Sequence, residues 1–191
     1  MDSRPAPDFE RFIANVARDL TARDLPFMLI GGQAVLLHGE PRLTLDIDIT
    51  LGVDPGRLDD VMDTCAALGL LPLPSEPDRF VRSTFVLPAA DSTGLRVDFI
   101  FSSTPYERQA IERAQHVEVG GVAVPFASAE DLILHKLFAG RARDLEDAAG
   151  IVRRKGESLD WTYMERWAEQ FSAIEGRESL VHQLRELRQR T

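Results

Sequence analysis

The sequence predicts an α/β protein of the α+β kind, in which helices flank a small mixed β-sheet and a helical region follows. Up to about residue 127, short apolar or strictly alternating runs are interspersed with helical periodicity, and beyond that point only helical periodicity is found. The chain has 191 residues, 44% hydrophobic and 28% charged, which is typical of a globular protein with a real core. We expect an α/β core over residues 1–127 and a C-terminal helical region over 128–191, packed on that core.

The amino-terminal quarter predicts a helix, a strand, a short helix and a second strand. Apolar residues recur at helical spacing over residues 7–25, and the run 26–32 predicts a short buried strand that two glycines close. A brief helix then stops at Gly39. Residues 43–53 alternate strictly, so one face carries Leu45, Ile47, Ile49 and Leu51 and the other carries Asp46, Asp48 and Thr50.

The middle of the chain predicts a helix over residues 54–70, with Asp54 as its cap and Pro55 at its first position. Two strands at 80–87 and 95–102, a short helix at 105–114 and a hairpin turning at Gly120 and Gly121 should follow. Ser128 and Asp131 form a capping box for a helix that Gly140 ends. Three more helices are expected within 143–156, 159–171 and 177–190.

Charge and cysteine content restrict the function classes. The net charge is −9, and because acidic and basic residues are equal in number from Gly140 onward, the whole excess lies in the first part of the chain. An acidic surface argues mildly against non-specific binding of DNA or RNA. The single cysteine, Cys65, excludes an internal disulfide and favours a reducing compartment. With no bilayer-length apolar run and no signal-peptide pattern, we expect a cytoplasmic protein without a membrane partner.

Three carboxylates occur in the predicted strands. Asp46 and Asp48 project from one strand face about 7 Å apart, and they would repel each other without a cation or a basic group nearby. Asp98 repeats the pattern between Val97 and Phe99 in the later strand. If the two strands are neighbours, the three acids converge on an oxygen-rich site suited to Mg²⁺ or Mn²⁺.

Gly31 and Gly32 add a possible phosphate site. They end a strand and open a helix, where backbone without side chains can approach a phosphate and present N–H groups to it. A phosphate cradle beside metal-binding carboxylates is what two-metal nucleotidyl transfer requires.

Gly31-Gly32, Asp46-Ile47-Asp48 and Asp98 together resemble the signature of the DNA polymerase β-like nucleotidyltransferase superfamily. The segment "EDLILHKLFAGRARDLED", residues 130–147, is similar to the lysine helix and acidic helix of its toxin-type branch, which serves abortive-infection systems. Each motif covers about a tenth of the chain. The sequence departs from the wider pattern at Gly32, where a serine is common in the superfamily.

The resemblance implies roles for particular residues. Asp46, Asp48 and Asp98 would be the catalytic carboxylates and metal ligands, with Asp98 also accepting the proton of the acceptor hydroxyl. The nucleotide would be contacted by Gly31, Gly32, Arg42, Thr44 and Lys136. It also implies an NTP substrate, Mg²⁺ or Mn²⁺ as cofactor, a tRNA, protein or small-molecule acceptor, and a cognate antitoxin if the chain is a toxin.

Several alternatives stay open at this point. The carboxylates could be the solvated face of an edge strand in a purely structural interaction protein, or the chain could be an inactive module that binds a nucleotide or a protein. Lys136 could be a lysine reaching the surface from a mostly buried helix. Asp147 is better explained as a helix partner of Arg141 or Arg143, and Asp144 is undecided.

Overall fold

The computed structural model describes residues 9–41, 44 and 46–189, and these form two compact units. The first unit is built from the chain up to Ile30 and from Thr44 to Phe126, and the second from Gly31–Leu43 and from Ala127 onward. The helical unit therefore takes up the short segment 31–43 in addition to the C-terminal region. Each unit has its own buried residues.

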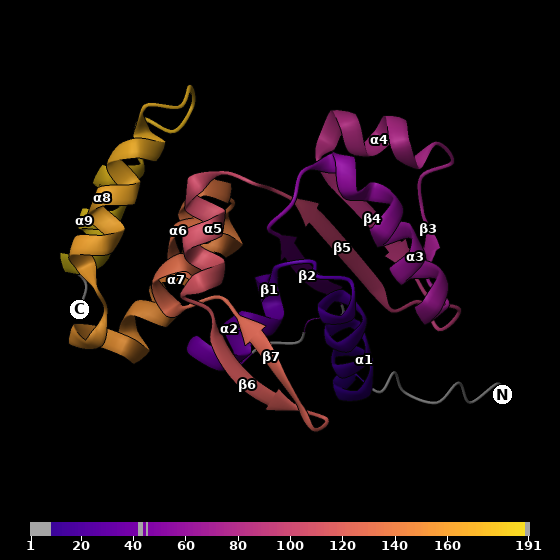
Figure 1. The fold of residues 1–191 in the computed structure, drawn as a ribbon. Helices are drawn as coiled ribbons and strands as arrows, with labels where there is room; N and C mark the ends of the chain where they lie inside the picture. The colour runs from indigo at the N-terminus through magenta and orange to yellow at the C-terminus, as the bar shows by residue number, and fades with distance from the viewer. Residues whose placement is uncertain (1–8, 42–43, 45, 190–191) are drawn as a thin grey trace, which may run out of the picture. The chain divides into compact units, whose positions relative to one another are not determined.

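The first unit holds a mixed sheet with helices. Its elements are α1 (Phe9–Ala22), β1 (Phe27–Ile30), β2 (Asp46–Leu51), η1 (Pro55–Arg57), α3 (Leu58–Leu68), β3 (Leu71–Pro72), α4 (Pro77–Thr84), β4 (Val86–Ala90), β5 (Arg96–Phe101), α5 (Pro105–Glu112), β6 (Gln115–Val119) and β7 (Val122–Phe126) (Figure 1). Within the described residues the sheet has seven strands in the order β3-β4-β5-β2-β1-β7-β6. The mixed α/β architecture expected from the sequence is confirmed.

The centre of the sheet is the pairing of β2 with β5. These strands run parallel and in register over their whole length, from Asp46 opposite Arg96 to Leu51 opposite Phe101. β1 pairs antiparallel with β2, and β4 pairs antiparallel with β5. The two strands with the predicted carboxylates are therefore neighbours inside the sheet, flanked on both sides, and neither is an edge strand.

Successive side chains of β2 and β5 point to opposite faces of the sheet. One face of the two strands is fully apolar and almost without exposed surface; its residues are Ile47, Ile49, Leu51, Val97, Phe99 and Phe101. The other face carries the acids, with Asp46 exposed and Asp48 and Asp98 half-buried. Burial of the apolar face fixes the register, because a slip of one residue would move every apolar side chain to the opposite face.

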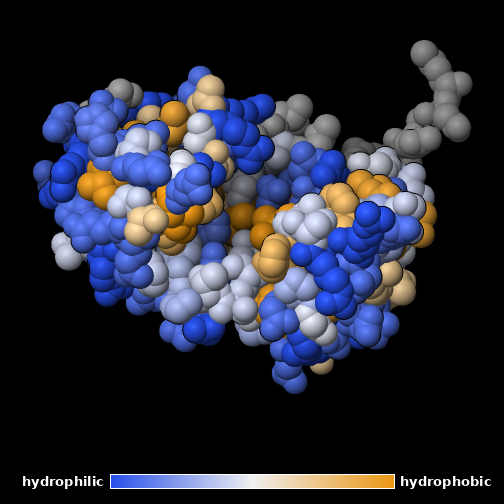
Figure 2. Space-filling model, turned by 90° about the horizontal axis from the view of Figure 1, so that it is seen from above, coloured by the Kyte–Doolittle hydropathy of each residue, from blue (hydrophilic) through white to orange (hydrophobic). Residues whose placement is uncertain are grey.

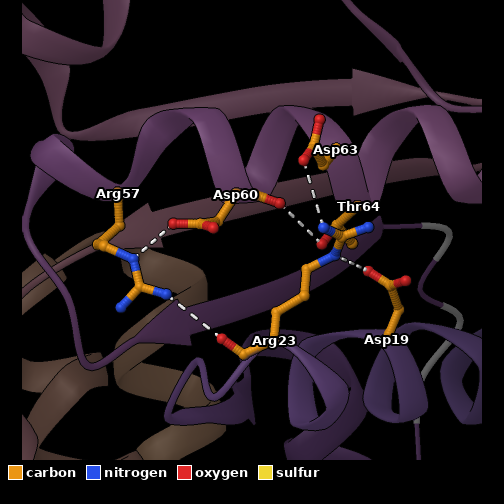
Figure 3. Close-up of polar contacts among 6 residues, drawn as sticks. All are labelled: Asp19, Arg23, Arg57, Asp60, Asp63 and Thr64. Atoms are coloured by element: carbon orange, nitrogen blue, oxygen red, sulfur yellow. Dashed lines mark hydrogen bonds and ion pairs between the residues drawn. The ribbon is translucent and has the colours of Figure 1, made fainter.

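A polar network joins α1 to the beginning of α3 (Figure 3). Nε of Arg23 lies 2.7 Å from a carboxylate oxygen of Asp19, and the guanidinium of Arg23 lies 3.4 Å from Asp63. Arg57 pairs with Asp60 and also donates to the main-chain oxygen of Arg23 at 3.3 Å. These groups are partly exposed, so the network orients the two helices and adds little to stability.

The strand predicted over residues 80–87 is wrong in its first part, because residues 77–84 form the helix α4 and only Val86 onward is a strand. Pro77 occupies the first turn of this helix, Arg82 pairs with Asp78 one turn earlier at 2.9 Å, and Val81 is its one buried residue. Phe85 then ends it in the left-handed conformation, with φ of 58°. Aromatic and β-branched residues suggested a strand, but the Pro77 start and the helical charge spacing favour a helix.

The second unit is helical. Its elements are α2 (Gly31–His38), α6 (Ala129–Ala139), α7 (Ala142–Lys155), η2 (Gly156–Ser158), α8 (Trp161–Ser172) and α9 (Leu180–Gln189). The α6 helix begins with the predicted capping box, since Ser128 accepts from the amide of Asp131, and it ends at Gly140 with φ of 70°. Nε2 of His38 lies 2.8 Å from the main-chain oxygen of Ala127, and this contact ties α2 to the start of α6.

Buried polar contacts hold the helices of this unit together. Asp131 is fully buried and accepts from Ser128 and from the hydroxyl of Tyr163, both at 2.6 Å. A second contact joins α7 to the residue after α2: the guanidinium of Arg154 donates to the main-chain oxygen of Gly39 at 2.7 Å. The segment after α2 is therefore anchored to α7.

No helix among the described residues is both long and apolar enough to cross a membrane. Hydrophilic residues cover most of the molecular face in Figure 2.

Replacing Ile49 by Ala should lower the free energy of unfolding by about 2–5 kcal/mol, because the side chain is fully buried beneath the carboxylate face and its loss leaves a cavity. The control is Ile174→Ala, at a side chain that is 46% exposed, where a change within about 0.5 kcal/mol is expected. Urea denaturation of both variants checks this. Equal losses at both positions would contradict the assigned burial.

Candidate functional site

The parallel pairing of β2 with β5 sets Asp48 directly opposite Asp98. Register partners in a sheet point to the same face, and neighbouring strands lie about 4.8 Å apart. Asp46 is two residues before Asp48 and therefore shares its face. Backbone geometry thus brings all three predicted carboxylates to one face, over two adjacent strands.

An arginine that the sequence did not single out lies among these acids. Arg96 is the register partner of Asp46, and its guanidinium donates to both carboxylate oxygens of Asp98, at 3.0 and 3.2 Å. The hydrogen bond and charge of Asp98, and more weakly the charges of Asp46 and Asp48, raise the pKa of Arg96 above its usual value. Arg96 is therefore the counter-ion of the carboxylate face.

The signal for Arg96 was present in the sequence, because it precedes Asp98 by two residues and so shares its strand face.

Thr50, which lies on the same face of β2 as Asp46 and Asp48, is almost completely buried. Its hydroxyl oxygen has no hydrogen-bond partner among the described residues. A buried hydroxyl beside Asp48 needs a partner, and a water molecule or ligand at this face would supply one.

The donor set fits a hard divalent cation in its chemistry and backbone placement, since three carboxylates suit Mg²⁺ or Mn²⁺. The side chains themselves are not gathered around one point: across residues 9–41, 44 and 46–189, no three or more His, Cys, Asp or Glu side chains form a group that could hold a metal ion. Arg96 lies on Asp98 instead. A cation at this face would therefore require Arg96 to turn away from Asp98.

The predicted nucleotide-binding residues are distributed over both units. Gly31 and Gly32 open α2 immediately after β1, as expected, and Gly31 has φ of 62°, in the region that favours glycine. Gly31 follows Ile30, which is the register partner of Asp48. Thr44 is half-buried, and its hydroxyl donates to the main-chain oxygen of Asp46 at 3.4 Å. Arg42 lies outside the described residues.

Lys136 is held in a buried ion cluster of the helical unit. Its side chain is 9% exposed, and Nζ lies 2.8 Å from Asp144 and 2.9 Å from Asp147. Arg141 also donates to Asp144, at 2.9 Å. The alternative of a lysine that reaches the surface is therefore wrong, because Lys136 is buried. Asp147 pairs with Lys136 across two helices, a partner that the sequence analysis did not anticipate. Contact of Lys136 with a nucleotide stays a prediction.

Asp144 is the electrostatic centre of this cluster. Burial acts to raise the pKa of its carboxyl group, but the hydrogen bond and charge of Lys136, together with those of Arg141, outweigh burial and lower the pKa below its usual value. The carboxylate is therefore the stable form of Asp144 in the folded protein.

Lys136→Met should destabilise the fold by about 3–5 kcal/mol, because it removes the buried cation that Asp144 and Asp147 share. Lys155→Met is the matched control, since Lys155 is the other lysine of the chain and is only half-buried. We expect it to change the free energy of unfolding by about 0.5 kcal/mol or less. Thermal denaturation of the two variants distinguishes them, and two equally mild effects would contradict the buried cluster.

The lowered pKa of Asp144 also predicts a pH dependence. A carboxylate with a lowered folded-state pKa stabilises the fold fully above its unfolded pKa of about 3.9, and this contribution is lost as the pH falls through the folded-state value. The stability difference between the wild type and Asp144→Asn should therefore shrink below about pH 4. The exposed Glu146 of the same helix provides the control Glu146→Gln, for which we expect no such trend. A constant wild-type advantage down to acid pH would argue against the ion pairs.

Comparisons with known proteins bear on the family and the fold of this chain. The family model described as "Nucleotidyltransferase of unknown function (DUF6036)" matches residues 10–185. No curated protein matches the sequence.

Solved structures with a similar fold include several nucleotidyltransferases. ANT(2'')-Ia, in complex with adenylyl-2''-tobramycin, aligns with a TM-score of 0.58 at 17% identity over 94% of this chain and 98% of its own. The lincosamide antibiotic adenylyltransferase LnuA, bound to lincomycin, has a TM-score of 0.52 at 15% identity over 78% of this chain and 98% of its own. A nucleotidyltransferase-like antigenic protein of Paracoccidioides brasiliensis has a TM-score of 0.52 at 14% identity, covering 92% of each chain.

At these identities the structural likeness shows the fold alone. The family model covers nearly the whole described chain, including both carboxylate strands and the Lys136 helix. This chain therefore belongs to the DUF6036 family of nucleotidyltransferases.

Proposed function

We propose that this protein transfers a nucleoside monophosphate from an NTP to a hydroxyl group, with Asp46, Asp48 and Asp98 holding Mg²⁺ or Mn²⁺. The observation that carries the proposal is the parallel register of β2 and β5, which aligns Asp48 with Asp98 on one sheet face. Membership of a nucleotidyltransferase family supports the same reaction class.

In this proposal the acceptor oxygen forms a bond to the α-phosphorus as the bond from that phosphorus to pyrophosphate breaks. Asp98 takes the hydroxyl proton, and pyrophosphate leaves. Bound divalent cations supply positive charge that activates the hydroxyl and stabilises the leaving pyrophosphate. Arg96 balances the carboxylate charge before the substrate binds, and Thr50 can hydrogen-bond to a water at the same face.

The resemblance further assigns Gly31, Gly32, Arg42, Thr44 and Lys136 to the nucleotide. Gly31 and Gly32 support this assignment through their position at the first turn of α2, directly after the strand residue paired with Asp48. For Lys136, a role at the nucleotide would require a change in its contacts with Asp144 and Asp147.

We also propose a toxin role, on the similarity of residues 130–147 to the toxin-type branch. Such a toxin would act in the cytoplasm on a tRNA, a protein or a small molecule, and a cognate antitoxin would restrain it. The single cysteine suits a reducing compartment: Cys65 is buried, and burial raises the pKa of its thiol to about 12, so the unreactive thiol form persists.

The second candidate is a catalytically inactive module of the same fold that binds a nucleotide or a protein. The Arg96–Asp98 ion pair favours it, because a guanidinium can replace the metal as permanent counter-ion of the carboxylates. Retention of all three acids on one face favours the active enzyme.

Asp48→Asn should lower nucleotidyl transfer by about 100-fold or more, because it removes one of the aligned carboxylates. The measurement is label transfer from each of the four α-labelled NTPs, with Mg²⁺ or Mn²⁺, to total RNA or to components of a cell lysate. Asp63→Asn is the control, since Asp63 is an exposed acid of α3 in the same unit. Two results would support the inactive module: no label transfer by the wild type from any NTP, or label transfer that is the same in the wild type and in Asp48→Asn.

A further inference from the structure

A pocket of 560 Å³ opens in the sheet unit next to the carboxylate face. It lies between the segment after β3, the helix α4 and the strands β4 and β5. Leu73, Phe80 and Pro88 supply apolar surface, and Glu76, Arg79 and Arg96 supply charge. Part of its lining comes from α4, whose residues 80–84 were predicted to belong to a strand.

The strand register connects this pocket to Asp98. Pro88 is the register partner of Asp98 in the antiparallel pairing of β4 with β5, so both side chains point to the same face. Arg96 lines the pocket and also donates to the carboxylate of Asp98 at 3.0 Å. A molecule that contacts Arg96 or Pro88 in the pocket is therefore close to Asp98, the proposed proton acceptor: Arg96 hydrogen-bonds to Asp98, and Pro88 lies on the neighbouring strand.

The apolar part of the pocket is unusually exposed. Two of the large hydrophobic side chains with substantial exposure among the described residues, Leu73 and Phe80, line it. Phe80 presents 38% of its surface and Leu73 presents 53%. An exposed aromatic ring that lines a pocket is a stacking surface for a flat ring system.

The charged residues of the pocket favour a ligand with negative charge. Two arginines face one glutamate, and Arg79 is only loosely paired with Glu76, at 3.4 Å, with both side chains largely exposed. A cation bound by the carboxylates would weaken the attraction between Asp98 and Arg96, which frees the guanidinium for an anion. A polycation such as an aminoglycoside would meet two like charges here.

We propose that this pocket is the acceptor subsite and that it binds a nucleoside 5'-phosphate unit with a free ribose hydroxyl. The base stacks on Phe80, the phosphate pairs with Arg96 and Arg79, and the ribose hydroxyl faces Asp98. This assignment rests on the proposed nucleotidyl transfer and names its acceptor. The unit could be a free mononucleotide or the 3' end of an RNA, which present the same chemistry.

The first test is direct binding in the presence of Mg²⁺. The probes are a 5'-fluorescein pentaribonucleotide with a free 3' hydroxyl, followed by anisotropy, and adenosine 5'-monophosphate as competitor. Phe80→Ala should weaken binding about tenfold or more, because it removes the stacking surface. Phe85→Ala is the matched control: Phe85 is also exposed and aromatic and is not among the pocket residues, so affinity should be unchanged. Competition by the monophosphate distinguishes a mononucleotide site from one that needs an RNA chain.

The second test separates this inference from the proposed function. Label transfer from NTP to the pentaribonucleotide is measured for wild type, Phe80→Ala and Asp48→Asn. The inference predicts a raised KM for the acceptor in Phe80→Ala, with the KM for NTP unchanged. Phe80-dependent binding without any Asp48-dependent transfer would overturn the proposed reaction and leave the nucleotide site intact. Equal probe binding by wild type and Phe80→Ala, or Asp48-dependent transfer to tobramycin or to protein instead, would overturn the acceptor assignment.

Discussion

The parallel pairing of β2 with β5 is the constraint on which the rest of the site depends. Burial of the apolar residues on one face fixes the register, and the fixed register aligns Asp48 with Asp98 on the other face. The aligned acids repel each other, and the positive charge of Arg96, which pairs with Asp98, reduces this repulsion. Arg96 both pairs with Asp98 and lines the pocket beside α4, so it is the residue that the acids and the pocket share.

The two units treat their charged groups differently. In the helical unit, Lys136, Asp144 and Asp147 are buried together, so each depends on the others and the cluster contributes to folding. On the sheet, the carboxylates are exposed or half-buried and Arg96 is 46% exposed, so their pairing is weaker. The lysine cluster is therefore part of the buried interior of its unit, whereas the carboxylate face is partly exposed.

Much of the fold could be predicted from the sequence because local signals agreed with tertiary structure. Strict alternation over residues 43–53 predicted β2, and residues 95–102 were predicted as the strand that contains β5. The pair Gly120 and Gly121 predicted the hairpin, and Ser128 with Gly140 predicted the limits of α6. The helix α4 was missed because aromatic and β-branched residues outweighed its proline start. Which strands pair in a sheet is not encoded locally. The sequence therefore predicted that Asp48 and Asp98 lie together only if their strands are neighbours, and the observed register shows that they are. The burial of Lys136 depends on packing against α7, which no local pattern specifies.

The most direct test of this account is Mn²⁺ binding to the carboxylate face, followed by calorimetry on wild type, Asp98→Asn and Arg96→Gln. We expect the wild type to bind Mn²⁺ and Asp98→Asn to bind it about tenfold or more weakly. Arg96→Gln should bind at least as tightly as the wild type, because the guanidinium that competes for Asp98 is gone. Equal Mn²⁺ affinity in wild type and Asp98→Asn, or weaker binding in Arg96→Gln, would contradict it.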